Sequence, residues 1–349
     1  MRVKLSIIIP TFNRGKSLGL LLKSLNGQIN LNDFEVIVVD NGSTDNTRAI
    51  CDQFLGTIPL IYSYNKEPGL LTGRHAGAEI ASGKILTFLD DDVELTQNYT
   101  QTIIDVFENF QDVDLATGPS IGKYEAPIPD WFIHFWTVTS DGEKYCTWLS
   151  LMDLGNREKF IHPNFIWGLN FSIRKHTFLD LGGFHPDCIP QNLQQFQGDG
   201  ETGLTIKAFE NNYKALYHPK IRLYHNVSKE RLTLNYLKKR AYYQGVCDSY
   251  TDLRLTKIEN NRIEITSTLK KITNKLHPCY RWIRKIIGKR KAVLPIHVLI
   301  MQNEINTAKR EGYNFHQKAF RNDSIVREWV LRENYWDYKL PLNGRDNKI

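Results

Sequence analysis

Four short apolar runs in the first ninety residues, rich in β-branched side chains, limit what this chain can fold into. Runs of this kind predict strands that are buried on both faces. Strands that alternate with helices over short connections form a mostly parallel, doubly wound α/β sheet. The predicted strands are residues 3–9, 34–39, 60–64 and 85–89, and the predicted helices are residues 18–25 and 72–81.

Acidic side chains follow two of these strands directly. Asp40 follows the second strand, and Asp90, Asp91 and Asp92 follow the fourth. Open parallel sheets bind their ligands outside the carboxyl ends of the strands. A carboxylate cluster there suits a hard divalent cation, Mn²⁺ or Mg²⁺, which in turn binds a diphosphate; an acidic turn without an ion is the alternative. Because alternate residues of an extended segment share a face, we expect Asp90 and Asp92 to point the same way and Asp91 elsewhere.

The segment after Asp40, Asn-Gly-Ser-Thr-Asp, predicts a rigid turn and then a helix capped by Ser43 or Thr44. A single carboxylate above such a turn suits the N3–H of a uracil ring. A capping role for Asp40 is the alternative, although Ser43 or Asp45 supplies a cap more readily.

Taken together, these segments resemble one family. SIIIPTFNR, VIVVDNGSTD, the pair Gly73-Arg74 and ILTFLDDD occur in the order and at the spacing of the inverting family 2 glycosyltransferases of the GT-A fold. The resemblance extends over roughly residues 3–245. It implies a GT-A fold, a nucleotide-diphosphate sugar donor, a divalent metal ion, and direct displacement with inversion at the anomeric carbon.

The resemblance also implies residues that contact the nucleotide sugar. Asp40 matches the base-binding aspartate, and Arg74 matches an arginine that faces the nucleotide or its phosphates. Asp90 and Asp92 match the DxD pair, in which the first carboxylate faces the ribose and the last binds the metal, and Asp91 is grouped with the nucleotide-sugar contacts. The matching nucleotide loop consists of Thr11, Phe12, Asn13 and Arg14.

Three further residues match the family more loosely. Trp167 and Asn170 lie in a segment that runs near the donor sugar and the acceptor, where an indole can stack on a pyranose and an amide can bind a hydroxyl. His225 stands in a Tyr-His context in which some members complete the metal site, so a ligand and a structural histidine are both open. His75 stands where the family usually has Asn, and no role is transferred to it.

An inverting transfer requires a general base that removes the proton of the attacking hydroxyl. The family supplies it from an acidic motif that opens a helix, and GDGETGLTIK matches this motif with Glu201 at the base position. Gly200 replaces the acidic neighbour that the family has there. Asp199 is therefore the second candidate, and an acid that interacts with the helix dipole is the alternative for both residues.

Charge divides the chain into two zones. From Val227 onward there are 26 Lys and Arg against 12 Asp and Glu, whereas the preceding residues have 19 basic and 26 acidic side chains. We expect a GT-A domain at residues 1–227, with a nucleotide-sugar half at about 1–120 and an acceptor half at about 121–227. A mostly helical, basic region is expected at residues 228–349.

Nine of the basic residues lie within residues 270–291, among aromatic and aliphatic side chains. This pattern suits an element that lies on an anionic membrane surface, and a solvated helix is the alternative. No nucleic-acid motif accompanies it, so no nucleic-acid partner is expected. A glycan on a polyprenyl carrier at the inner face of the cell membrane would be a compatible acceptor.

The remaining sequence features indicate a cytoplasmic protein, held peripherally at most on that membrane face. The five cysteines are scattered without a CxxC pair, and the sequence has no run of roughly 18 apolar residues. The predicted activity is metal-dependent transfer of a sugar from a UDP-sugar to a hydroxyl of a glycan or lipid-linked glycan, in polysaccharide biosynthesis for the cell envelope. Two alternatives are a sugar nucleotidyltransferase, which would release pyrophosphate, and a non-enzymatic protein whose basic half binds membrane or nucleic acid.

Overall fold

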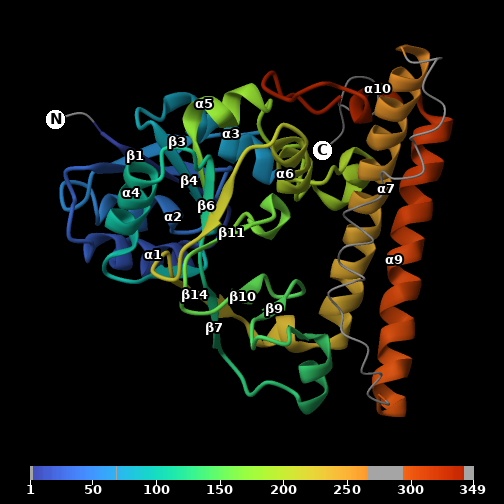
Figure 1. The fold of residues 1–349 in the computed structure, drawn as a ribbon, viewed down its shortest axis with the longest axis horizontal. Coiled ribbons are helices and arrows are strands. Elements are labelled where there is room, and N and C mark those ends of the chain that lie inside the picture. Colours follow the sequence, from blue (N-terminus) through green and yellow to red (C-terminus); the bar gives the residue numbers. More distant parts are fainter. Residues whose placement is uncertain (1–2, 68, 266–293, 342–349) are drawn as a thin grey trace.

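The structure is a computed structural model that describes residues 3–67, 69–265 and 294–341. An α/β body stands beside two long helices, α7 (Leu234–Ile265) and α9 (Ile296–Asn322) (Figure 1). These helices run in the same direction, because Lys238 pairs with Glu304 near their starts and Ser249 with His316 further along.

An eight-stranded mixed sheet forms the centre of the body. Its parallel pairs are β1 with β2 and β4, β2 with β3, and β6 with β13, whereas β12 is antiparallel to both of its neighbours and β11 to β13. All four predicted strands are present, and they lie side by side. The order is β11 (Lys159–Ile161), β13 (Ala215–Tyr217), β6 (Leu115–Thr117), β12 (Asn170–Arg174), β4 (Ile85–Leu89), β1 (Leu5–Thr11), β2 (Phe34–Asp40) and β3 (Leu60–Tyr64).

A second, six-stranded sheet lies beside the first and includes the strand that carries His225. Its order is β5 (Val93–Leu95), β14 (Leu223–Val227), β7 (Ser120–Tyr124), β10 (Leu151–Asp153), β9 (Lys144–Cys146) and β8 (Thr137–Val138). The short 3₁₀ helices are η1 (Asp130–Phe135), η2 (Pro163–Phe165), η3 (Gln191–Phe196) and η4 (Lys229–Leu232).

Helices cover both faces of the eight-stranded sheet, because alternate residues of its strands point to opposite sides. Ile7 and Ile9 of β1 belong to the core on one face, and Ile8 belongs to the core on the other. The first face packs against α1 (Gly15–Asn26), α2 (Thr47–Asp52) and α4 (Tyr99–Asn109). The second packs against α3 (Leu70–Ile80), α5 (Lys175–Asp180) and α6 (Glu201–Glu210).

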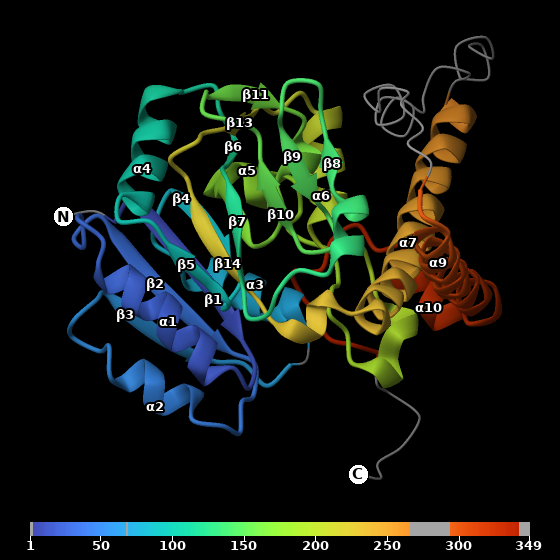
Figure 2. The ribbon, with the colours of Figure 1, turned by 90° about the horizontal axis from the view of Figure 1, so that it is seen from below.

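The helical C-terminal region is present as predicted, and it shares a core with the sheet. Helix α10 (Ser324–Val330) and the segment after it bury Trp329 and Tyr335 among the residues of the second face. Figure 2 shows α7, α9 and α10 together at one side of the sheets. The basic segment 270–291 lies outside the described residues, and no helix within them is long and apolar enough to span a membrane.

Two glycines allow the long helices to touch along their backbones. A Cβ atom added at Gly312 would overlap the carbonyl oxygen of Tyr242, and one added at Gly245 would overlap that of Lys309. We therefore expect Gly312→Ala to lower the free energy of unfolding by about 1–3 kcal/mol, as overpacking does, in equilibrium denaturant unfolding.

The matched control is Gly19→Ala in α1, where the added atom would meet Ile50 at an ordinary 3.4 Å. This control should be neutral or stabilising by up to about 1 kcal/mol, because alanine favours the helix. Equal stability of Gly312→Ala and the wild type would contradict the close helix contact.

Candidate active site

A cavity of about 680 Å³ opens at the carboxyl ends of β1, β2 and β4. The start of α6, strand β14 and the first turns of α7 complete its wall, so both halves of the sequence contribute to it. The lining residues include Thr11, Phe12, Arg14, Asn41, Arg74, Asp90, Asp91, Gly168, Glu201, His225, Arg231, Tyr236 and Arg240.

The three consecutive aspartates do not alternate as expected. Asp91 accepts a hydrogen bond from Thr11 at 2.7 Å, and Asp91 and Asp92 both pair with Arg14. Asp90 pairs instead with Arg74, at 3.2 Å. The prediction that Asp90 and Asp92 point the same way is wrong, because residues 91 and 92 form a turn rather than an extended segment.

Asp92 is the most strongly paired of the three. Its Oδ2 accepts from Arg14 at 2.8 Å and from Arg231 at 2.9 Å, and Nε2 of His225 lies 3.5 Å away. Burial alone would raise the pKa of Asp92, but the guanidinium groups of Arg231 and Arg14 hold it well below its ordinary value. Burial raises the pKa of Asp91 to about 7 in spite of Arg14 and Thr11. Asp92 is therefore the permanent anion beside the cavity.

One atom of Asp92 retains lone pairs that suit a metal ion. Oδ1 of Asp92 is buried without a hydrogen-bond partner. Nδ1 of His225 lies 2.9 Å from the Leu149 carbonyl, so this ring nitrogen carries the proton, and Nε2 accepts a hydrogen bond from Arg231 at 2.6 Å. Within residues 3–67, 69–265 and 294–341, however, no three His, Cys, Asp or Glu side chains form a metal-binding group. The donor set fits one hard cation bound mainly by Asp92.

A buried arginine joins the aspartates to the opposite wall. The Arg74 side chain is 3% exposed, and its guanidinium lies 3.2 Å from Asp90 and 3.7 Å from Glu201. Glu201 opens α6, accepts from the backbone N–H of Gly168 at 3.1 Å, and keeps a quarter of its side chain exposed to the cavity. Glu201 and Asp90 thus line the same cavity and contact the same guanidinium.

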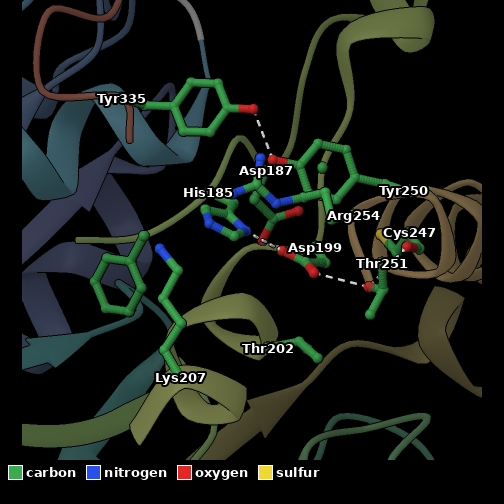
Figure 3. A network of polar contacts seen from close by, with 12 residues as sticks. His185, Asp187, Asp199, Thr202, Lys207, Cys247, Tyr250, Thr251, Arg254 and Tyr335 are labelled. Carbon is green, nitrogen blue, oxygen red and sulfur yellow. Dashed lines mark hydrogen bonds and ion pairs between the residues drawn. The ribbon is translucent and has the colours of Figure 1, made fainter. Parts of the chain in front are cut away.

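Asp199, the second candidate base, does not line the cavity. Its Oδ1 lies 2.7 Å from Nδ1 of His185, and its Oδ2 accepts from the Thr251 hydroxyl at 2.7 Å (Figure 3). Both carboxylate oxygens are engaged in a buried network, whereas the Glu201 carboxylate is accessible.

The predicted nucleotide loop holds the turn after β2. Asn13, in a left-handed conformation with φ 53°, accepts from Thr44 N–H at 2.7 Å, and its own N–H donates to Ser43 at 2.8 Å. The prediction that Ser43 or Thr44 caps α2 is wrong, because these residues bind the loop and Asp45 accepts from Thr47 N–H at the helix start.

Asp40 is buried and does not line the cavity. It accepts from Ser43 N–H at 2.7 Å and from the Tyr62 hydroxyl at 2.7 Å. Each of its oxygens retains one further lone pair for a ligand.

Trp167 and Asn170 do not line the cavity, whereas Gly168 and Leu169, which lie between them, do. Asn170 accepts from the Tyr99 hydroxyl at 2.6 Å, and its amide donates to backbone carbonyls. The donor-sugar contacts expected of these two residues are therefore absent from this geometry. Trp167 does not line the cavity, and the buried Asn170 amide uses its hydrogen bonds within the protein.

His75 is buried beside the hydrophobic core on the second face of the sheet, where it contacts Phe184 and Trp336. Its Nε2 accepts from Phe184 N–H at 3.0 Å, its ring stacks on Trp336, and burial lowers its pKa to about 3.

Several lining residues were not predicted from the sequence. Arg231, Tyr236 and Arg240 come from the region after β14, and Trp148 and Ser150 come from the loop before β10. The basic composition of the C-terminal region indicated a membrane or nucleic-acid partner and gave no sign that its first turns close the cleft. Arg231 follows His225 by six residues, and that proximity was the one available signal.

Comparisons with known proteins agree with this architecture. The family profile described as "Glycosyl transferase family 2" matches residues 6–180. A glucosyl-dolichyl phosphate glucuronosyltransferase of Haloferax volcanii is 23% identical over 72% of this chain and 78% of its own length. A GalNAc(5)-diNAcBac-PP-undecaprenol beta-1,3-glucosyltransferase of Campylobacter jejuni is 36% identical, but over only 29% of this chain and 33% of its own.

A solved structure extends the likeness to the whole fold. The mannosyltransferase PcManGT from Pyrobaculum calidifontis, in complex with GDP-Man and Mn²⁺, superposes with a TM-score of 0.50 at 15% identity, over 97% of this chain and 86% of its own. The α/β body has the GT-A fold, and neither a nucleotidyltransferase nor a non-enzymatic protein accounts for the family match. The chain belongs to glycosyl transferase family 2 and is a glycosyltransferase.

Proposed function

We propose that this protein transfers a sugar from a UDP-sugar to a hydroxyl of a glycan or lipid-linked glycan, with a divalent cation and with inversion. One observation carries the proposal: Glu201, a partly exposed carboxylate, lines the same cavity as Asp90, and the guanidinium of Arg74 lies between the two carboxylates. An inverting transfer needs this arrangement, because the acceptor must attack the anomeric carbon from the side opposite the departing diphosphate.

The donor would bind over residues 1–120. Phe12 is 56% exposed at the cavity and offers a ring for stacking on the base. Asp40 would accept the N3–H of uracil through a remaining lone pair, and Arg14 and Asp90 would face the phosphates and the ribose. Thr11 and Asn13 would act by holding the loop and Asp91 in place.

Asp92 would hold the cation, with His225 and Asp90 beside it. When bound, the cation offsets charge on the diphosphate as it departs. The structure of PcManGT is a complex with GDP-Man and Mn²⁺, and the unpartnered Oδ1 of Asp92 supports the use of a divalent cation here. Arg14 and Arg231 already pair with Asp92 and lie where they would also meet phosphate oxygens.

Glu201 would act as the general base. Its carboxylate takes the proton of the acceptor hydroxyl while that oxygen bonds to the anomeric carbon. The bond from this carbon to the diphosphate breaks, and UDP leaves with the electron pair. The Gly168 N–H and Arg74 hold the Glu201 side chain in place for this step.

The acceptor would bind on the side formed by residues 121–227 and the start of the region 228–349. Trp148 and Tyr236 offer rings for a sugar face, and Arg240 offers donors for a polar group. The Haloferax and Campylobacter relatives are named for acceptors on dolichyl phosphate and undecaprenol. This supports a polyprenyl-linked acceptor in the assembly of an envelope polysaccharide.

Such an acceptor would be reached from the inner face of the cell membrane. The nine basic residues of segment 270–291 would provide attraction to anionic lipid. In the sequence, this segment is followed by α9, whose first turns expose three apolar side chains, Ile296, Leu299 and Ile300.

Glu201→Gln tests the base directly. The amide keeps the size of the side chain but cannot take the proton, so we expect transfer to fall by roughly 10²-fold or more while UDP binding is unchanged. Product formation and UDP calorimetry measure the two effects.

Two variants serve as controls for this test. Glu210→Gln alters an exposed residue at the other end of α6 and should retain full transfer. Asp199→Asn should retain measurable transfer; a fully active Glu201→Gln beside an inactive Asp199→Asn would assign the base to Asp199 instead.

Membrane binding is tested with vesicles. We expect the full chain to co-sediment with vesicles of phosphatidylglycerol and phosphatidylcholine, and to be released as the salt concentration rises, since charge attraction is screened. The variant Arg281→Gln, Arg284→Gln, Lys285→Gln should bind more weakly. Equal binding to vesicles of phosphatidylcholine alone would contradict an electrostatic attachment.

A further inference from the structure

The C-terminal helices α7 and α10 bind the loop that leads into α6. Phe196 and Asp199 lie on this loop, five and two residues before Glu201. Both are bound by side chains that come from α7 or from the segment around α10. Figure 3 shows the part of this network around Asp199 and His185, with Thr251, Tyr250 and Tyr335 near them.

Asp199 makes the bond nearest to the proposed base. Thr251 of α7 donates to Oδ2 at 2.7 Å, and the His185 ring donates to Oδ1 at 2.7 Å. Burial lowers the pKa of His185, so the ring is neutral and acts as a donor through Nδ1. Burial alone would raise the pKa of Asp199, but His185 and Thr251 outweigh it and hold the pKa below its ordinary value. Asp199 is thus an anion whose two oxygens are engaged.

The turn from Asp199 to Glu201 has little freedom to adjust. Gly200 has φ 57°, and its carbonyl accepts from the backbone N–H of His185 at 3.0 Å. The carbonyl of Asp199 accepts from Thr202 N–H at 3.0 Å. A displacement of the Asp199 side chain would therefore be passed on to the first residue of α6, which is Glu201.

A second set of bonds fixes the same loop to the end of the chain. Trp329 donates through its indole to the Phe196 carbonyl at 2.8 Å. The Tyr335 hydroxyl donates to the Trp329 carbonyl and lies 2.6 Å from the hydroxyl of Tyr250 in α7. Arg254 of α7 donates to the backbone carbonyl of Val330 at 2.6 Å. The loop, α7 and the segment after α10 thus form one bonded unit.

We infer that Thr251 and Asp199 are positioning residues for Glu201, and that the C-terminal helices belong to the catalytic apparatus through this contact. The inference rests on the proposed function, because it takes Glu201 as the base. Thr251 touches neither donor nor acceptor: it does not line the cavity. Its hydroxyl acts through Asp199 on the direction in which the Glu201 carboxylate points.

The variant Thr251→Val tests this, because valine has the shape of threonine without the hydroxyl. We expect kcat to fall about tenfold or more, since a small misplacement of a reacting group costs that much. KM for the donor and the Kd for UDP should stay within about twofold, because the donor contacts are untouched. Thr251→Ser restores the hydroxyl and should restore kcat.

Thr256→Val is the matched control. Thr256 lies on the same helix and is exposed, and among the described residues its hydroxyl bonds within the helix, to the Asp252 carbonyl at 2.8 Å. It should keep wild-type kcat. An unchanged kcat in Thr251→Val would overturn the inference. A loss of kcat that is matched by an equal loss of UDP-binding sites would indicate unfolding, and Tyr335→Phe then decides.

Tyr335→Phe provides a second variant if Thr251→Val does not fold. It keeps the ring but removes the bonds to Trp329 and Tyr250, and the same fall in kcat with unchanged UDP affinity is expected. Glu201→Gln in the same assay separates the two proposals. If Glu201→Gln is inactive and both network variants are fully active, the positioning role fails alone; if Glu201→Gln is fully active, the proposed base fails with it.

Discussion

The buried guanidinium of Arg74 is the contact on which the two sides of the cleft depend. A positive charge that is 3% exposed needs nearby anions, because an unpaired buried charge is very costly. Asp90 supplies one from the end of β4, and Glu201 supplies the other from the start of α6. The donor side and the proposed acceptor side therefore keep a fixed separation. Helix α3 can carry Arg74 this far inward because Gly77 packs directly on the Ile8 side chain of β1.

The strands that build the donor side were predictable from the sequence for a simple reason. Their apolar runs have no polar face, so they can only lie in the middle of a sheet that is covered on both sides. The positions of Asp40 and Asp90 follow from that placement. The orientation of the aspartates could not be predicted in this way. It depends on Arg14 and Arg74, which come from other elements, and on the turn at residues 91 and 92 that replaces the expected extended segment.

The local sequence favoured Glu201 over Asp199 as the base but left both open. The motif places Glu201 at the base position, and Asp199 is a second acid just before the same helix. They differ in their surroundings, since Asp199 meets His185 and Thr251 while Glu201 meets the cavity. Thr251 lies fifty residues further along the chain, in a region whose composition pointed to membranes. Its contact with Asp199 depends on the packing of α7 against the loop before α6, which the local sequence does not reveal.

The central claim is that the cavity at the carboxyl ends of β1, β2 and β4, beside Asp92, binds a uridine nucleotide together with a divalent cation. Calorimetry of UDP, GDP and dTDP, with and without Mn²⁺, tests it most directly when the wild type is compared with Asp92→Ala. The account predicts that UDP binds most tightly, that Mn²⁺ strengthens its binding, and that Asp92→Ala removes the effect of Mn²⁺. Absence of nucleotide binding under all conditions, or an unchanged Mn²⁺ effect in Asp92→Ala, would contradict it.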